Sequence, residues 1–84
     1  CPCLELAYSS LKIKRSAPTV LNASNEVAVD AFLNKQIKYL SIPQIVEKTL
    51  NKASISDINS IKDVIEIDED SRGIAKDLIS SGKF

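Results

Sequence analysis

Hydrophobic residues recur along most of the chain at the spacing of one face of a helix. Near the N-terminus such residues fall at i, i+3, i+4 and i+7, which predicts a short amphipathic helix over Leu4–Leu11. Further helices are expected over Asn22–Leu33 and Ser41–Leu50, over two turns near Ile61–Ile65, and from Asp68 to Gly82. The pattern therefore predicts an all-α fold, a small bundle of three to five helices forming one domain over residues 1–84.

Capping residues mark the expected helix starts. Pro18 disfavours a helical conformation at Ala17, so the second helix is expected to begin after this pair. Thr19 or Asn22 is its expected cap, because either side chain can accept from free main-chain N–H groups. The segment Ser41-Ile-Pro-Gln44 fits a capping box, in which the serine and the glutamine bond each other's main chain.

The C-terminal third carries two more capping patterns. Ser60-Ile-Lys-Asp63 is one of them, and Asp68 is expected to cap the last helix, with Glu69 and Asp70 in its first turn. Three adjacent acids could instead recruit a divalent ion, but such sites need oxygens that converge from several directions. Gly82 is expected to end the last helix in a left-handed conformation.

Asn22, Asn25 and Glu26 are the most informative polar residues of the chain. They crowd the expected start of a helix and are followed only by small or β-branched residues and one aspartate until Phe32. This pattern predicts a helix start that is held by specific hydrogen bonds and packed closely against a neighbour. The three residues are candidates for a structural or interface role, with direct ligand contact as the alternative.

Composition excludes several classes of function. The chain has 11 Lys+Arg and 11 Asp+Glu, so no net field would attract nucleic acid or an anionic membrane. No apolar run approaches the roughly 18–20 residues that cross a bilayer. A single domain is the most that 84 residues form. Because the chain contains no methionine, it is expected to be a fragment, a processed product or a cloned domain.

Candidate catalytic chemistry is sparse. Cys1 and Cys3 are the only cysteines and the chain has no histidine, so they cannot complete a four-ligand zinc site. The absence of histidine also removes the usual base that activates a serine nucleophile. Lys12, Lys14 and Arg15 form a small basic patch, for which a solvated turn is favoured over a phosphate site.

Several segments together resemble the C-terminal part of deoxyxylulose-phosphate reductoisomerase. The longest is Ala17-Pro-Thr-Val-Leu-Asn-Ala-Ser-Asn-Glu-Val-Ala-Val29, preceded by Pro2-Cys-Leu-Glu-Leu-Ala-Tyr8 and followed by Ala31-Phe-Leu-Asn34. Later segments agree in order and spacing: Ile37–Pro43, Ile45–Leu50, Ile67-Asp68 and Ser71-Arg72. The resemblance covers nearly the whole chain.

The resemblance implies an enzyme of the non-mevalonate isoprenoid pathway. Such enzymes convert 1-deoxy-D-xylulose 5-phosphate to 2-C-methyl-D-erythritol 4-phosphate with NADPH and a divalent metal, Mg²⁺ or Mn²⁺. The family's nucleotide loop, metal ligands and phosphate cradle lie in domains outside this chain. The resemblance therefore assigns no catalytic, cofactor-binding or metal-binding residue here, and it implies a chain that is inactive alone and supports the catalytic domain.

The resemblance implies that the partners are the remaining domains of the same enzyme and that the complete enzyme is a homodimer. Neither nucleic acid nor a membrane is an expected partner. The implied location is a bacterial cytoplasm or, alternatively, a plastid. Two turns depart from the family, which commonly has glycine where this chain has Lys14-Arg15 and Lys35. These residues resist positive φ, so the geometry of the two turns does not follow from the resemblance.

Two other functions compete with this interpretation. A free-standing helical interaction module would dock a partner helix on its apolar faces, but it leaves the run Asn22–Val29 unexplained. An acyl-carrier-like bundle is a weaker alternative, because Asp57-Ile-Asn59 does not match the Asp-Ser-Leu attachment site of such carriers.

Overall fold

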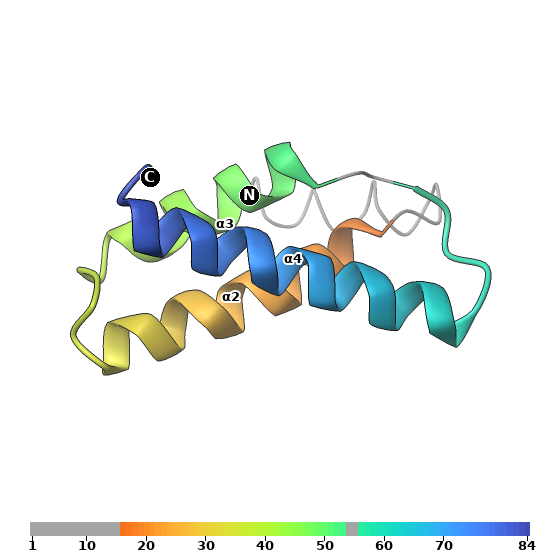
Figure 1. Cartoon of the computed structure of the whole chain (residues 1–84), viewed down its shortest axis with the longest axis horizontal. Coiled ribbons are helices and arrows are strands. Elements are labelled where there is room, and N and C mark those ends of the chain that lie inside the picture. The colour runs from red at the N-terminus through yellow and green to blue at the C-terminus, as the bar shows by residue number, and fades with distance from the viewer. Residues whose placement is uncertain (1–15, 54–55) are drawn as a thin grey trace, which may run out of the picture.

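The computed structural model describes residues 16–53 and 56–84, which form the helices α2 Ala17–Leu33, α3 Ser41–Lys52 and α4 Ile61–Ser81. Figure 1 shows α2 and α4 running in the same direction, with α3 returning between them in the chain. The described residues contain no strand, and the predicted all-α bundle is confirmed. The helix expected over Leu4–Leu11, the two thiols and the basic patch lie outside the described residues.

Small side chains line the buried face of α2. The buried positions recur every three or four residues, and they are Ala17, Val20, Ala23, Ser24, Val27, Ala28 and Ala31. Such residues let neighbouring helices approach closely, and α2 contacts both α3 and α4 more extensively than these two contact each other. The predicted close packing of this segment is confirmed.

The hydrophobic core lies where the three helices meet. Its buried members are Val27 and Ala28 of α2, Ile45 of α3 and Ala75 of α4. Partly buried hydrophobic residues surround it: Ile37, Ile42, Ile79 and Phe84. Each helix thus buries one apolar stripe against the other two.

Buried hydroxyl groups satisfy their hydrogen bonds within their own helices. Ser24, Thr49 and Ser71 each donate to the carbonyl four residues earlier, at 2.7 Å. No buried side-chain nitrogen or oxygen among the described residues lacks a partner. These polar residues therefore occupy the interior without the cost of an unmade hydrogen bond.

The predicted start of α2 was wrong by about one turn and a half. The helix begins at Ala17, and Pro18 lies in its first turn, where the missing N–H of proline costs nothing. Neither Thr19 nor Asn22 is therefore a cap. The residue before the helix is Ser16, whose N–H donates to the Ser56 carbonyl at 2.9 Å and ties the start of α2 to the segment before α4.

The capping box predicted at Ser41 is also absent. Leu40 precedes α3, and no side chain caps this helix. The first helical N–H groups instead donate to main-chain carbonyls of the preceding turn, from Ser41 to Lys38 at 2.9 Å and from Ile42 to Tyr39 at 3.1 Å. The turn itself thus supplies the acceptors that the serine hydroxyl was expected to provide.

One continuous helix, α4, replaces the two that were predicted in the C-terminal third. The Ser60 cap is confirmed, because its hydroxyl oxygen accepts from the Asp63 N–H at 3.1 Å, while the Asp63 carboxylate accepts from the Asn59 N–H at 2.9 Å. The left-handed Gly82 is confirmed, with φ +70°. Asp68 lies inside the helix and caps nothing, since the helical ladder continues through it.

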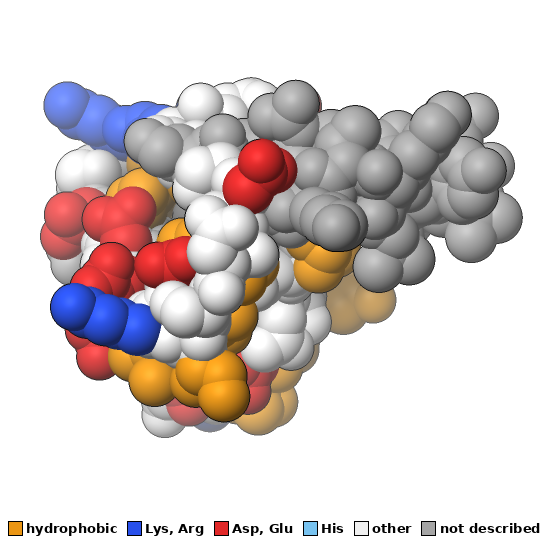
Figure 2. Space-filling view, turned by 90° about the vertical axis from the view of Figure 1, so that its right-hand side faces the viewer, with side chains coloured by type: hydrophobic (Ala, Val, Ile, Leu, Met, Phe, Trp, Pro, Cys, Tyr) orange, Lys and Arg blue, Asp and Glu red, His pale blue; other side chains and the backbone are white. Residues whose placement is uncertain are grey.

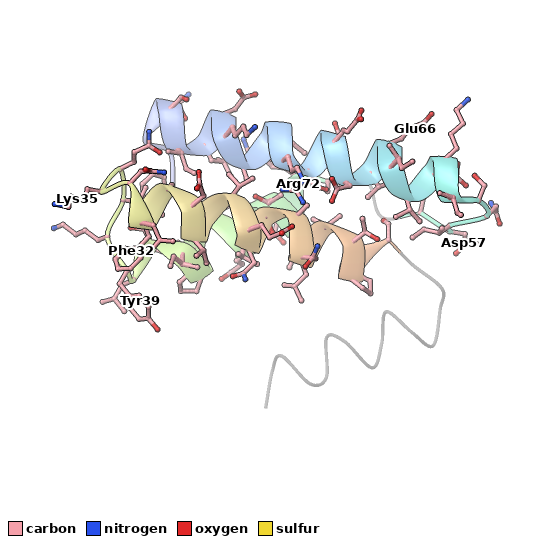
Figure 3. The ribbon with its side chains drawn as sticks, turned by 90° about the horizontal axis from the view of Figure 1, so that it is seen from below. Phe32, Lys35, Tyr39, Asp57, Glu66 and Arg72 are labelled. Atoms are coloured by element: carbon pink, nitrogen blue, oxygen red, sulfur yellow. The ribbon has the colours of Figure 1, made fainter. Side chains whose placement is uncertain are left out.

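The turn after α2 keeps a left-handed conformation although it lacks glycine. Lys35 has φ +62°, at one of the two turns where the resemblance implies glycine. Its N–H donates to the Phe32 carbonyl at 3.0 Å, and the Gln36 N–H donates to the Ala31 carbonyl at 2.9 Å. These bonds close the helix end and hold a conformation that costs a non-glycine residue roughly 1–2 kcal/mol. Figure 3 shows Lys35 at the same end of the molecule as Phe32 and Tyr39, whose rings meet edge to face.

Candidate functional site

The three candidate residues of α2 lie on the exposed surface of its second and third turns. Asn22, Asn25 and Glu26 are exposed. The prediction that they hold the start of the helix was wrong, because α2 begins at Ala17. The Asn22 amide donates to the Glu26 carboxylate at 3.3 Å. The structure divides the set, because Glu26 is directed toward α4 whereas Asn22 and Asn25 border a groove between α2 and α3.

Arg72 of α4 bridges the two helices. Its Nη2 contacts Glu26 Oε2 at 2.5 Å, and its Nε donates to Asp68 Oδ2 at 2.7 Å. Figure 3 shows the Arg72 side chain between α4 and α2. The fixed fork of the guanidinium therefore holds one carboxylate on its own helix and one on the neighbouring helix.

The electrostatics of this clamp, Glu26–Arg72–Asp68, favour a permanent ion pair. Hydrogen bonds to Asp68 and then to Glu26 raise the pKa of Arg72 above its already high ordinary value. The Arg72 and Asp68 side chains are 34% and 30% exposed, so water and salt still screen the pair. The cation stays charged at any working pH, and the clamp joins α2 to α4 without acting as a proton donor.

A polar groove of about 450 Å³ adjoins the clamp between α2 and α4. Its charged lining consists of two acids, Glu26 and Asp30, and two bases, Arg72 and Lys76. These charges balance, so the groove favours neither an anionic nor a cationic ligand. Among the described residues, no group of three or more acidic, cysteine or histidine side chains is placed to hold a metal ion.

A second groove, of about 500 Å³, lies between α2 and α3. Its lining contains no charged residue and consists of Pro18, Leu21, Asn22, Asn25, Ile42, Pro43 and Val46. Leu21, Ile42 and Val46 are only partly buried, so apolar surface remains open to solvent. The two asparagine side chains are the only polar side chains of this surface, which is here called the α2–α3 groove.

Acidic residues gather around the start of α4. Figure 2 shows acidic side chains beside exposed hydrophobic ones at this end of the molecule. Lys62 pairs with one of these acids, since its ammonium lies 3.9 Å from the Glu66 carboxylate on an exposed surface. Arg72 does not take part in this pair, because its guanidinium is engaged with Asp68 and Glu26.

Sequence reasoning missed Arg72 as the residue that joins the helices. The spacing of Asp68 and Arg72, four residues apart in a helix, was a usable signal for their pairing. Nothing in the sequence indicated that Glu26, 46 residues away from Arg72, would complete the clamp.

Comparison with known proteins identifies the family. A family model described as the DXP reductoisomerase C-terminal domain matches residues 1–74. The chain belongs to this family. It is 46% identical over 80 residues to 1-deoxy-D-xylulose 5-phosphate reductoisomerase of Geotalea daltonii, which covers 95% of this chain and 21% of that protein. The Rhodospirillum centenum reductoisomerase is 43% identical over 82 residues, covering 98% of this chain and 20% of the relative.

A solved structure supports the same assignment for the fold. The Zymomonas mobilis reductoisomerase in complex with NADPH superposes with a TM-score of 0.80 at 45% sequence identity, over 93% of this chain and 21% of that one. The chain thus spans about one fifth of the length of the relatives that it matches. None of its described helices is long and apolar enough to cross a membrane.

Proposed function

We propose that this chain is the C-terminal domain of a complete reductoisomerase. That enzyme converts 1-deoxy-D-xylulose 5-phosphate to 2-C-methyl-D-erythritol 4-phosphate in isoprenoid biosynthesis. The observation that carries the proposal is the family match over residues 1–74, together with 45% identity to a reductoisomerase solved with NADPH. The complete protein is accordingly an NADPH-dependent oxidoreductase, and its expected location is the bacterial cytoplasm, or a plastid.

In this proposal the domain supports catalysis without performing it. No group of three or more acidic, cysteine or histidine side chains among the described residues could hold a divalent metal, so none of them is given a metal-binding role. NADPH and Mg²⁺ or Mn²⁺ are assigned to the rest of the enzyme, and the 84-residue chain alone is expected to be inactive.

The supporting role is consistent with the way the helices are joined. Arg72 links α4 to Glu26 of α2, and the small residues of α2 bring α3 and α4 close to it. Such a bundle offers a preformed surface on which the catalytic domain can pack. The partners proposed are therefore the remaining domains of the same polypeptide, in an enzyme expected to be a homodimer.

The size of the native polypeptide tests this proposal against a free-standing interaction module. Immunoblotting of source-cell extract with an antibody to this sequence is expected to give a band near five times 9.2 kDa, because the chain spans about one fifth of its relatives. The purified polypeptide is then expected to oxidise NADPH when deoxyxylulose phosphate is added. A native band of 9.2 kDa would instead favour the interaction module.

A further inference from the structure

The large hydrophobic side chains that are exposed among the described residues lie at two places, one at each end of the bundle. Leu33, Tyr39 and Leu40 flank the turn between α2 and α3, with exposed fractions of 70%, 68% and 75%. Ile61 and Ile65 lie in the first two turns of α4 and are 79% and 52% exposed. Exposed hydrophobic residues are ordinary when scattered, but they mark interaction surfaces when they are grouped. The grouping therefore points to contacts at the ends of the bundle.

One of these ends is basic. The turn Leu33–Leu40, here called the basic end, contains the exposed Lys35 and Lys38. The sequence has no acidic residue between Asp30 and Glu47. Neither lysine forms an ion pair with another residue of the described part of the chain. The exposed hydrophobic side chains of this end are therefore bordered by positive charge that no neighbouring carboxylate cancels.

The other end is acidic. Residues 57–66, here called the acidic end, contain one lysine, Lys62, and three acids, Asp57, Asp63 and Glu66. Lys62 pairs with Glu66 alone, and the Asp63 carboxylate accepts from a main-chain N–H, which leaves its negative charge in place. Figure 3 shows Asp57 and Glu66 at the opposite end of the molecule from Lys35. The neutral total charge of the chain thus conceals two ends of opposite sign.

The two ends cannot meet within one molecule. Because α2 and α4 run in the same direction, the end of α2 lies far from the start of α4 (Figure 1). Helix α4 has 21 residues, and a rise of about 1.5 Å per residue separates its two ends by roughly 30 Å. Surfaces that match in charge and in exposed hydrophobic area, and that one molecule keeps apart, can pair only between two molecules.

We propose that the basic end of one copy of this chain binds the acidic end of a second copy. The exposed hydrophobic side chains of the two ends then cover one another, and the lysines of one copy face the carboxylates of the other. A second copy supplies what each end lacks, since the charge complementarity lies between two surfaces of the same sequence. The inference goes beyond the proposed function and does not depend on it.

The geometry and the size of this contact define its behaviour. It is heterologous, since it joins two different surfaces, so each added copy leaves one free end of either kind. Few side chains take part, which places the contact among weak, transient ones that bury less than about 1,200 Å². Association is therefore expected to grow with protein concentration, and salt is expected to weaken it because the charges are exposed.

Charge exchange in the complete native polypeptide tests the inference. Lys35→Glu with Lys38→Glu gives a variant with two acidic ends, and Asp57→Lys with Glu66→Lys gives one with two basic ends. All four positions are exposed. Lys48→Glu with Lys76→Glu is the control, because both lysines are exposed on the helices outside the two ends. Circular dichroism checks that each variant keeps its helical content.

Sedimentation velocity then measures association, beyond the homodimer for a complete reductoisomerase and beyond the monomer for a 9.2 kDa polypeptide. The unmodified polypeptide is expected to associate less at about 1 M salt than at about 0.1 M. Each end variant alone is expected to raise the dissociation constant roughly tenfold or more, and the control to stay within about twofold. An equimolar mixture of the two end variants is expected to associate again, because one then has two acidic ends and the other two basic ends.

Several results would overturn the inference: no association of the unmodified polypeptide at any concentration, association that both end variants retain, or a mixture that does not recover it. The last result would exclude the pairing of unlike ends. The immunoblot described above reports the polypeptide size separately. Absence of association therefore leaves the proposed function standing, and a 9.2 kDa band leaves the head-to-tail contact standing.

Photocrosslinking provides a second readout that changes no charge at either end. A benzophenone amino acid replaces Leu40 in one variant and Lys48 in the control, and isotopically light and heavy copies are mixed before irradiation. We expect crosslinks that carry both isotopes, from position 40 to the peptide that contains Ile61 and Ile65, at a yield roughly tenfold or more above that of position 48. Crosslinks from position 40 to residues 1–15, to the basic end of another copy, or only within one copy would contradict the proposed contact.

Discussion

Truncation of Ile45 tests whether the three helices share a single core. Ile45 is fully buried on α3 and packs in one cluster with Val27, Ala28 and Ala75. Ile45→Ala removes three carbon atoms, worth about 2.4 kcal/mol at about 0.8 kcal/mol for each buried methylene group. The cavity left behind raises the expected loss to about 3–4 kcal/mol, because its walls belong to three helices that cannot all collapse into it. The main-chain carbonyl that accepts from Thr49 stays in place.

Urea unfolding of the 84-residue chain, followed by far-UV circular dichroism, measures this loss. A domain of this length is expected to be stable by roughly 4–12 kcal/mol, so the variant loses a large part of its total stability. The control is Leu40→Ala, at a position that is 75% exposed, where a change within about 0.5 kcal/mol is expected. Equal losses in the two variants would refute the assignment of Ile45 to the core. An Ile45→Val loss of about 0.5–1.5 kcal/mol would complete the series.

Three further substitutions test local features, each read from the same unfolding curves. Lys35→Gly is expected to stabilise the chain by up to about 1 kcal/mol by relieving the positive φ, and destabilisation would contradict a left-handed turn. Ser60→Ala removes the cap of α4 and is expected to cost about 1 kcal/mol; no loss would mean that the cap is replaceable by water. Arg72→Gln is expected to destabilise more at low than at high salt, because the Debye length falls from about 10 Å at 0.1 M to about 3 Å at 1 M. Because the pKa of Arg72 is raised in the folded chain, its contribution to stability is complete below the ordinary arginine pKa and is lost only in strong base. The stability difference between the Arg72→Gln variant and the unmodified chain is therefore expected to show no effect of arginine titration between pH 6 and 9. Lys62→Gln, which breaks only an exposed pair, is the control and is expected to change nothing measurable.

The helical elements could be predicted because hydrophobic periodicity reports burial directly. Of the small and β-branched residues after Glu26, Val27, Ala28 and Ala31 are buried against the other helices, as expected for close packing. Ser60 and Gly82 were identified correctly because their signals are local: a hydroxyl three residues before the amide that it accepts from, and a glycine after the last helical turn.

The predicted starts of α2 and of the last helix were wrong because each depended on a residue type that has two structural uses. Proline disfavours a helical residue before it, yet it also fits the first turn of a helix, and Pro18 has the second use. An aspartate near the end of an apolar stretch can cap a new helix or pair within a continuing one. Asp68 pairs with Arg72, four residues later, and α4 continues. The choice between these uses depends on tertiary packing rather than on the local sequence.

The candidate site could be predicted only in part, since Asn22, Asn25 and Glu26 were identified but Arg72 and the groove beside Asn25 were not. The contact between Glu26 and Arg72 joins residues 46 positions apart, and no local pattern encodes it. The groove beside Asn25 likewise exists only where α2 and α3 pack together. Sequence alone therefore grouped Asn22, Asn25 and Glu26 as one set, whereas the fold gives them different neighbours.

The helix α2 makes more contacts with the rest of the bundle than α3 does. Its buried stripe contacts α3 and α4, and Glu26 meets the cation of α4. By contrast, α3 has only Ile45 and Thr49 buried, so most of its substitutions are expected to change stability little.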